Sequence, residues 1–360
     1  MSILNKIILS PFALLYAMVI AIRNFLYKKR FFRSVKFGVP VICIGNLSTG
    51  GTGKTPHIDY LIATLKHNYS VGVISRGYRR KTTGYAEVQT NSKAIDVGDE
   101  PLLLKWRHPE AHIAVSESRA FGIPKLVHNK EENFVVLLDD AFQHRAVRAG
   151  LNILLTKYND LYIDNQILPL GNLREFKSGA DRADIIIVTN TPKDISKEDK
   201  NAIVAKLKPK SYQYVLFSNI VYQKTYYIQN NQIKFAELEK DSSIILVSGI
   251  ANNNSLVQYL ENKYANVYQR KFSDHHQFTA QDVESIISTY KNTSATKKYL
   301  LTTEKDLTRL LPFIEEFNKN EILIHCLPIR INFAPEEREK FDKLIHFFVD
   351  TTLEEYLNQE

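Results

Sequence analysis

Cysteine is nearly absent from this chain of 360 residues, which contains only Cys43 and Cys326. Both lie in apolar runs, and neither belongs to a motif with other metal-ligating residue types. This scarcity argues against a disulfide framework and against a zinc site. We therefore expect both thiols to be small buried apolar side chains in a reducing compartment.

Acidic residues are absent from the first 36 positions. That segment holds seven cations, and they supply nearly all of the formal net charge of +8: Lys6, Arg23, Lys28, Lys29, Arg30, Arg33 and Lys36. The rest of the chain is close to neutral, which argues against a general nucleic-acid-binding face. We expect no nucleic-acid partner.

The N-terminal segment also lacks an apolar run of full membrane-spanning length. Residues 7–22, IILSPFALLYAMVIAI, form an uncharged run of 16 residues, whereas a spanning helix usually needs about 20. Each cation near anionic lipid contributes about 1 kcal/mol to membrane binding. Because a basic cluster follows the run, we expect residues 1–36 to form a helix held peripherally or monotopically at the cytoplasmic face of a membrane. A signal peptide and a core helix with a basic end are the alternatives.

Internal repeats and low-complexity segments are absent too, and the composition is that of an ordinary globular protein. Short apolar runs alternate with helical patterns, which predicts an α/β fold with a parallel sheet covered on both faces. A Tyr- and Ile-rich segment then predicts antiparallel strands that join two domains. The expected parts are the N-terminal helix, a first domain over 37–209, a strand linker over 210–235 and a smaller α/β domain over 236–360.

A glycine-rich loop lies between the first predicted strand and the first predicted helix of this fold. The Walker A pattern G-x-x-x-x-G-K-[ST] aligns here, with a serine in place of the first glycine, as Ser48, Thr49, Gly50, Gly51, Thr52, Gly53, Lys54 and Thr55. The glycines can turn N–H groups toward an anion, and the helix adds its positive end. Lys54 would reach the β- and γ-phosphates, and Thr55 would ligate Mg²⁺. The flanking strand and helix favour a P-loop NTPase-like domain over a chance turn.

A second motif, FVVLLDD at 134–140, is a predicted buried strand that ends in Asp139 and Asp140. In a P-loop protein such a strand places one carboxylate near Mg²⁺, and we expect Asp139 to be that ligand. Acids follow many strands, so the motif gains its meaning from the glycine-rich loop. The usual subclasses do not fit: TNTPKD at 189–194 has the wrong spacing for a guanine-reading motif, and Thr49 stands where membrane-partitioning ATPases carry lysine.

Seven ordered motifs resemble those of the tetraacyldisaccharide 4'-kinase family, the lipid A 4'-kinases of Gram-negative bacteria. They are GNLSTGGTGKTP (45–56), ISRGYRRK (74–81), VGDEPLLL (97–104), DDAFQH (139–144), LPLGNLRE (168–175), DHHQF (274–278) and TTEKD (302–306). Ala141-Phe142 replaces a more usual Gly-Leu, and GIANNN (249–254) lacks a proline that often follows there. The resemblance implies transfer of the γ-phosphoryl group of ATP, with Mg²⁺, to the 4'-hydroxyl of tetraacyldisaccharide 1-phosphate at the inner membrane. We expect a monomer.

The resemblance gives chemical roles to residues that would otherwise be structural. Phosphoryl transfer to an alcohol needs a base, and the family implies Asp99 in that role, tuned by His275. Lys54, placed at the phosphates by the Walker A pattern, is expected to assist catalysis. Without the resemblance, Asp99 and Glu100 would be favourable acids at a helix start, and DHH would be a solvated loop. Because His275 lies in the second domain, its approach to Asp99 is expected to require closure.

The resemblance also suggests roles for Arg174 and Glu175. Arg76 and Arg119 are expected to bind phosphate because of the donor geometry of arginine. Gln143 and His144 are expected to line the same site because they directly follow the strand that ends in Asp139-Asp140. Glu175 is expected to be a second metal ligand. The expected substrate contacts are Arg76, Glu100, Arg119, Asp140, Gln143, His144 and Arg174. TTEKD is expected to begin a helix capped by Thr303, and we assign it no chemical role.

A rival class is a membrane-associated P-loop ATPase or assembly factor that drives a partner protein. It explains the glycine-rich loop, the paired acids and the N-terminal helix, but it leaves LPLGNLRE and DHHQF without a purpose. A binding module without turnover would in addition leave Lys54 and the paired acids idle.

Overall fold

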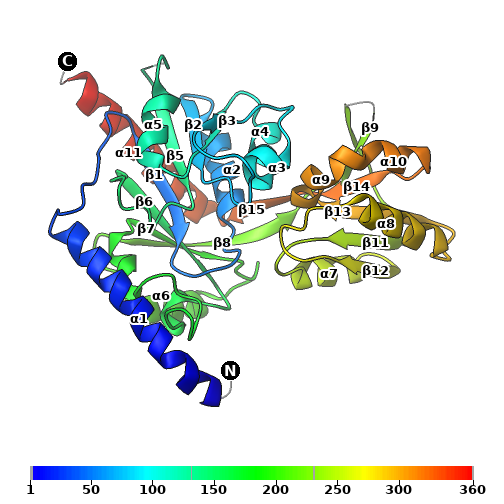
Figure 1. The fold of residues 1–360 in the computed structure, drawn as a ribbon, viewed down its shortest axis with the longest axis horizontal. Coiled ribbons are helices and arrows are strands. Elements are labelled where there is room, and N and C mark those ends of the chain that lie inside the picture. Colours follow the sequence, from blue (N-terminus) through cyan, green and yellow to red (C-terminus); the bar gives the residue numbers. More distant parts are fainter. Residues whose placement is uncertain (1–2, 131, 230–231, 359–360) are drawn as a thin grey trace.

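A nine-stranded, mostly parallel sheet forms the core of the first of two lobes (Figure 1). The computed structural model describes residues 3–130, 132–229 and 232–358, with side chains from residue 7 onward. The strands lie in the order β15 (Ile329–Phe333), β8 (Tyr214–Tyr222), β7 (Ile185–Thr189), β6 (Leu151–Lys157), β1 (Val41–Asn46), β5 (Phe134–Asp139), β2 (Ser70–Ser75), β4 (His112–Val115) and β3 (Ala86–Glu87). The two edge strands, β15 and β3, pair antiparallel, and all pairs between β8 and β4 are parallel.

Helices cover both faces of this sheet, as the apolar strand runs predict. One face is covered by α2 (Lys54–Leu65), α4 (Asp99–Arg107) and α11 (Pro335–Leu357), whose apolar side chains join one core cluster. The other face is covered by α5 (Arg119–Val127) and α6 (Lys197–Leu207). Strands β1 and β5 are buried at every position, because a strand between two helical layers has no solvated side. Three short helical segments complete the lobe: α3 (Ala94–Val97), η1 (Tyr162–Asp164) and η2 (Lys177–Arg182).

The second lobe is a smaller α/β unit on a six-stranded sheet, at the right of Figure 1. Its strands are β10 (Gln232–Phe235), β9 (Tyr226–Gln229), β14 (Ile324–Leu327), β13 (Lys298–Thr303), β11 (Ser243–Ser248) and β12 (Asn266–Lys271). One face packs on α8 (Ala280–Asn292), α9 (Glu304–Leu310), η3 (Leu311–Phe313) and α10 (Ile314–Lys319), and the other on α7 (Asn254–Glu261).

The chain crosses between the lobes twice, and its C-terminal part returns to the first lobe. Strand β15 pairs antiparallel with β8, with Ile329 opposite Tyr222, and α11 buries Phe341, Ile345 and Val349 in the core of the first lobe. The prediction from the sequence differs: it places all of 236–360 in the second domain and 210–235 in a strand linker. The difference has a physical reason: the spacing of these apolar residues predicts an amphipathic helix, but it does not specify which sheet the helix covers.

Buried ion pairs join the lobes where α4 meets α9. The Arg107 guanidinium donates from Nε to Glu304 Oε1 at 3.0 Å, and its Nη1 lies 3.0 Å from Asp59 Oδ2 in α2. Arg330 in β15 lies 3.4 Å from Glu304 Oε2. Removing one partner of such a network would leave an uncompensated buried charge, so the network favours one relative placement of α2, α4 and α9.

Helix α1 (Ile3–Lys28) lies along the outside of the first lobe (Figure 1). Ala13 and Ile20 are buried against the lobe, whereas most of the large apolar side chains from residue 7 onward are exposed: Ile7, Ile8, Phe12, Leu14, Leu15, Met18, Val19, Ile22 and Phe25. This exposure argues against a core helix. By length and composition, Ile7–Lys28 is long and apolar enough to cross a membrane, and a signal sequence would meet the same criterion.

Candidate active site

The glycine-rich loop joins β1 to α2 at the carboxyl edge of the first sheet. Gly50 and Gly53 have φ angles of 94° and 85°, a region that glycine adopts without strain. A Cβ added at Gly50 or Gly51 would meet nothing within 4 Å, so the loop borders open space. Lys54 is the first residue of the 12-residue helix α2. A helix N-terminus that follows a glycine-rich loop is a suitable site for phosphate.

The LPLGNLRE segment is hydrogen-bonded to the backbone of this loop. The Thr49 N–H donates to the Asn172 carbonyl at 2.7 Å, and the Arg174 N–H donates to the Leu47 carbonyl at 2.7 Å. Gln143 adds a third contact, since its Nε2 donates to the Asn46 carbonyl at 2.8 Å. The segment therefore fixes the backbone between the first strand and the glycines, in addition to supplying the side chains of its last two residues.

Asp139 ends β5, the strand beside β1, and the residue is 2% exposed. Burial, followed by the charges of Glu100 and Asp140, raises the pKa of Asp139 to about 7. Its Oδ1 has no hydrogen-bond partner among the described residues, and an unpaired buried carboxylate oxygen costs free energy. A divalent cation bound there would remove that cost, so Asp139 and the Thr55 hydroxyl fit a Mg²⁺ site.

Only a partial protein shell is available for this metal. In the described ranges, no group of three or more His, Cys, Asp or Glu side chains is arranged to hold a metal ion. Mg²⁺ is usually held by one or two carboxylates together with substrate phosphates and water, so few protein ligands would be needed. Glu175, the expected second ligand, is 3% exposed, and its Oε1 accepts from Gln143 Nε2 at 2.9 Å and from Arg182 at 2.7 Å. Its metal role stays a prediction.

Asp140 connects two cations at the mouth of the loop. Its carboxylate accepts from Arg174 Nη1 at 3.0 Å, and its Oδ1 lies 3.6 Å from Lys54 Nζ. Burial alone would raise the pKa of Asp140, but the positive charges of Lys54 and Arg174 outweigh burial and lower it. The ionised carboxylate thus holds both cations beside the space where phosphates would bind.

Arg119 and His144 lie beside Asp139 and form one wall of the site. Arg119 begins α5, and its guanidinium donates to the Asp139 carbonyl at 3.2 Å, while its backbone N–H donates to His144 Nε2 at 3.3 Å. Burial, followed by the charges of Arg119, Arg23 and Arg76, lowers the pKa of His144 to about 4. His144 is therefore neutral at pH 7, and the positive charge of this wall comes from arginines. Arg76 follows β2 and is exposed.

Asp99 meets His275 across the two lobes. Asp99 opens α4 after Gly98, whose φ of 94° and ψ of 150° belong to a region essentially restricted to glycine. His275 Nδ1 lies 2.9 Å from Asp99 Oδ2, so the lobes already make the contact for which we expected closure. Burial alone would raise the pKa of Asp99, but the His275 hydrogen bond and the nearby Lys305 and Arg309 charges lower it.

The second histidine of the DHHQF motif points elsewhere. His276 Nε2 lies 3.0 Å from Asp282 Oδ2, and its ring stacks on Phe272 with centroids 4.9 Å apart. The sequence could not separate the two histidines, because adjacent residues in a loop give no periodic signal for direction. The geometry selects His275 as the partner of Asp99.

Two residues near this pair were missed by the sequence reasoning. Lys305 Nζ lies 2.8 Å from Glu100 Oε1 and 3.0 Å from His275 Nε2, and the buried Arg309 has Nε 3.7 Å from Asp99 Oδ2. Both belong to α9, where Thr303 caps the helix as predicted by accepting from the Asp306 N–H. Their four-residue spacing places them on one helical face, but only the tertiary structure shows that α4 lies opposite.

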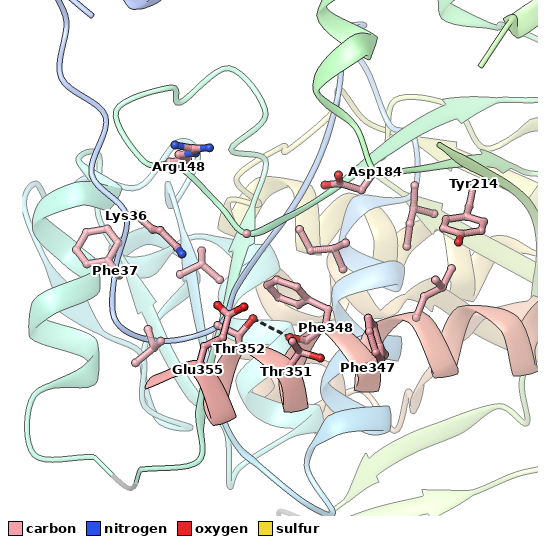
Figure 2. Close-up of a pocket in the computed structure, with 16 residues that line it drawn as sticks. Lys36, Phe37, Arg148, Asp184, Tyr214, Phe347, Phe348, Thr351, Thr352 and Glu355 are labelled. Atoms are coloured by element: carbon pink, nitrogen blue, oxygen red, sulfur yellow. Dashed lines mark hydrogen bonds between the residues drawn. The ribbon is translucent and has the colours of Figure 1, made fainter. Parts of the chain in front are cut away.

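A separate pocket of about 370 Å³ lies away from these residues. Figure 2 shows Lys36, Phe37, Tyr214 and Phe348 around it, with side chains from α11 along one side. Its other walls include the first residues of β1, β6, β7 and β8. Because those strands are parallel, this pocket lies at the amino edge of the sheet, opposite the glycine-rich loop.

Comparisons with known proteins agree over nearly the whole chain. The profile of the family LpxK, tetraacyldisaccharide-1-P 4'-kinase, matches residues 5–346. The chain is 42% identical over 354 residues to tetraacyldisaccharide 4'-kinase of Flavobacterium johnsoniae, covering 98% of this chain and 100% of that protein. It is 41% identical over 353 residues to the protein of the same name from Bacteroides thetaiotaomicron, with 95% and 92% covered. Its fold is similar to crystalline "apo" form LpxK from Aquifex aeolicus in complex with ATP, with a TM-score of 0.72, 28% identity, and 96% and 99% of the two chains covered.

Proposed function

The chain belongs to the tetraacyldisaccharide 4'-kinase family, and from that premise we propose how its own residues carry out the transfer. The protein is a lipid kinase that uses ATP with Mg²⁺. We propose that the γ-phosphoryl group passes to the 4'-hydroxyl of tetraacyldisaccharide 1-phosphate, the acceptor named for its relatives. The observation that carries this proposal is the 2.9 Å contact between Asp99 Oδ2 and His275 Nδ1. This pair lies near the P-loop: after burial, the charge of Glu100, the neighbour of Asp99, is the largest cause that raises the pKa of Asp139.

The nucleotide side of the site uses the first lobe alone. Within residues 48–55, the N–H groups other than that of Thr49, which donates to the Asn172 carbonyl, would bind the phosphates. Lys54 would donate to the β- and γ-phosphate oxygens. Arg174, which donates to the Asp140 carboxylate, and Arg119, which donates to the Asp139 carbonyl, would add positive charge to stabilise the negative charge of the transferred group. Mg²⁺, when bound, neutralises charge on the transferred group, and Thr55, Asp139 and Glu175 are its proposed protein ligands. Ser48, Thr49, Thr52, Gln143 and His144 would shape the surrounding wall.

The acceptor side uses both lobes. Asp99 accepts the proton of the sugar hydroxyl, and His275 orients the carboxylate. The pKa of Asp99 lies below its usual range, so its carboxylate is a weak base. A strong base is not required, because phosphoryl transfer in most analyses has a loose transition state in which the attacking oxygen has formed little of its bond to phosphorus. Asp99 therefore orients the hydroxyl first and receives its proton late, as the new O–P bond forms. Glu100, which follows Asp99 in α4, and Arg76, which follows β2, are the proposed contacts to the headgroup.

Incubation with γ-labelled ATP and tetraacyldisaccharide 1-phosphate tests this function. We expect label in the lipid, in an amount equal to the ADP formed. Label in free phosphate, with none in lipid, would instead indicate the membrane-associated ATPase or assembly factor. Label that stays in ATP would contradict both enzymes and leave only a binding module.

We propose that α1 holds the enzyme peripherally at the cytoplasmic face of the inner membrane. Its exposed apolar side chains and the basic residues from 23 to 36 suit a surface of anionic lipid. The Tyr16 hydroxyl donates to the Arg174 carbonyl at 2.8 Å, and Arg23 donates to the Gln143 carbonyl. Helix α1 therefore contacts the segments that flank the P-loop, which suits an acceptor that arrives from the membrane. All proposed site residues come from one chain, so a monomer suffices.

Charges placed on the exposed face of α1 are expected to weaken membrane binding. Leu14 and Met18 are 69% and 58% exposed and lie one helical turn apart, so Leu14→Glu with Met18→Glu removes apolar contact and adds repulsion from anionic lipid. We expect the vesicle-bound fraction in co-sedimentation to fall by about tenfold or more, since each lost contact costs on the order of 1 kcal/mol. Ile233→Glu, at an exposed position of β10, is the control and should bind normally. Normal binding by the double variant would contradict the proposed anchor.

A further inference from the structure

Lys305 occupies a position to which the transfer chemistry above gives no role. It lies in the first turn of α9, and its side chain is only 20% exposed. Its ammonium group has two neighbours, Glu100 Oε1 at 2.8 Å and His275 Nε2 at 3.0 Å. His275 thus has a hydrogen-bond partner on each ring nitrogen, with the Asp99 carboxylate on Nδ1 and the Lys305 ammonium on Nε2.

These two partners restrict the protonation of the imidazole. An ammonium group donates hydrogen bonds and accepts none, and an ionised carboxylate accepts and donates none. Nε2 must therefore carry its lone pair toward Lys305, and Nδ1 must carry its hydrogen toward Asp99. A protonated ring would direct an Nε2–H at the ammonium, which is unfavourable both as a hydrogen bond and as a contact between like charges.

The other groups around His275 leave this conclusion unchanged. Asp274 Oδ2 lies 3.8 Å from Nε2 and its side chain is 41% exposed, so it is farther away than Lys305 and in contact with water. Tyr78 touches the ring only edge-on, with centroids 5.1 Å apart. Arg309 Nε lies 3.7 Å from Asp99 Oδ2, so its charge acts on the carboxylate. Lys305 is the closest polar group to Nε2 among the described residues.

We propose that Lys305 is a positioning residue that fixes His275 as its neutral Nδ1–H tautomer. The inference rests on the proposed role of Asp99 as base. In that role, the sugar O–H bond breaks as the new O–P bond forms, its hydrogen goes to the Asp99 carboxylate, and ADP leaves with the electron pair of the broken P–O bond. With Lys305 in place, His275 donates to Asp99 throughout and does not take up the proton itself, so Asp99 is the only proton acceptor of the pair.

The tautomer can be observed directly. In wild-type enzyme labelled with ¹⁵N-histidine, with the His275 signals assigned by their loss in His275→Gln, we expect the pattern of an Nδ1–H imidazole at pH 7. In Lys305→Met, which keeps the length of the side chain without its donors, we expect a mixture of tautomers or a protonated ring. Wild-type enzyme with its hydrogen on Nε2 would overturn the proposal without reference to any variant.

Kinetics give the second readout. Loss of a partner that orients a histidine typically costs about 10- to 100-fold in metal sites, and we expect a similar loss of kcat in Lys305→Met, with KM for ATP unchanged because α9 lies outside the P-loop. Lys305→Arg, which retains donors, should recover part of kcat. Lys319→Met, at an exposed lysine of α10, is the matched control. Wild-type kcat in Lys305→Met would overturn the proposal.

The Asp99→Asn variant distinguishes failure of the proposed role of Lys305 from failure of the proposed role of Asp99 as base. If Asp99→Asn is inactive while Lys305→Met has wild-type kcat and tautomer pattern, the role of Lys305 is wrong and the role of Asp99 stands. If Asp99→Asn keeps full activity, the base assignment fails and the proposed role of Lys305 fails with it.

Discussion

Asp99→Asn is expected to lower kcat by about 10²- to 10⁴-fold, the usual contribution of a positioned general base. The amide has nearly the shape of the carboxylate, and its oxygen can still accept the hydrogen bond from His275 Nδ1, which lies 2.9 Å from the carboxylate. The variant therefore removes the proton acceptor while keeping the contact between the lobes. Lipid phosphorylation with labelled ATP gives kcat, and calorimetric titration gives the affinity for ATP, which should be retained.

A nearby carboxylate supplies the control for this variant. Asp96→Asn removes an acid from α3, the short helix that precedes Gly98, and should have wild-type turnover. The role of Asp99 as base is contradicted if Asp99→Asn binds ATP poorly but turns over normally at saturating ATP, since its effect would then be on nucleotide binding.

Lys54→Met is expected to lower kcat by about 10²- to 10³-fold, the range found when one preorganised donor to a developing charge is removed. Lys54 is the first residue of α2 and lies 3.6 Å from Asp140 Oδ1, with only 12% of its side chain exposed. Methionine keeps the side-chain bulk, so the change is the loss of one positive charge at the phosphates. Affinity for ATP should fall as well, whereas KM for the lipid acceptor should not change.

The control for Lys54→Met comes from the other end of the same helix. Lys66→Met replaces the C-cap residue of α2, whose ammonium pairs with Glu110 at the surface, and surface pairs contribute little. Wild-type kcat in Lys54→Met would show that the glycine-rich loop binds no reacting phosphate.

Local patterns in the sequence were sufficient for the parts of the fold that depend on neighbouring residues. The apolar run at 134–140 predicts β5 close to its observed bounds, Phe134–Asp139, because strands buried on both faces need continuous apolar side chains. The glycine-rich loop was predictable for a similar reason, since its function depends on eight consecutive residues between a strand and a helix. The Thr303 cap also depends on residues only three positions apart.

Other features depend on contacts between distant segments, and the sequence contains no local signal for them. The apolar stripe of α11 does not indicate which sheet it covers. Lys305 and Glu100 are separated by 205 positions. From the sequence, the motif TTEKD therefore predicts only the start of a helix and not this contact. The sequence does not show whether His275 or His276 contacts Asp99. His275 has a left-handed backbone conformation, with a φ of 55°, and its side chain points toward α4. In each case the deciding information is the packing of the two lobes.

The return of β15 to the first sheet has a consequence for synthesis of the protein on the ribosome. The sheet that contains the P-loop is completed at one edge by residues 329–333 and covered by α11, whereas the strands and helices of the second lobe lie within residues 226–327. The emerging polypeptide therefore presents α1 and most of the nucleotide-binding lobe before the second lobe. The segment that completes the first lobe is synthesised after the second lobe. Until then the apolar face that α11 covers is open to chaperones and proteases.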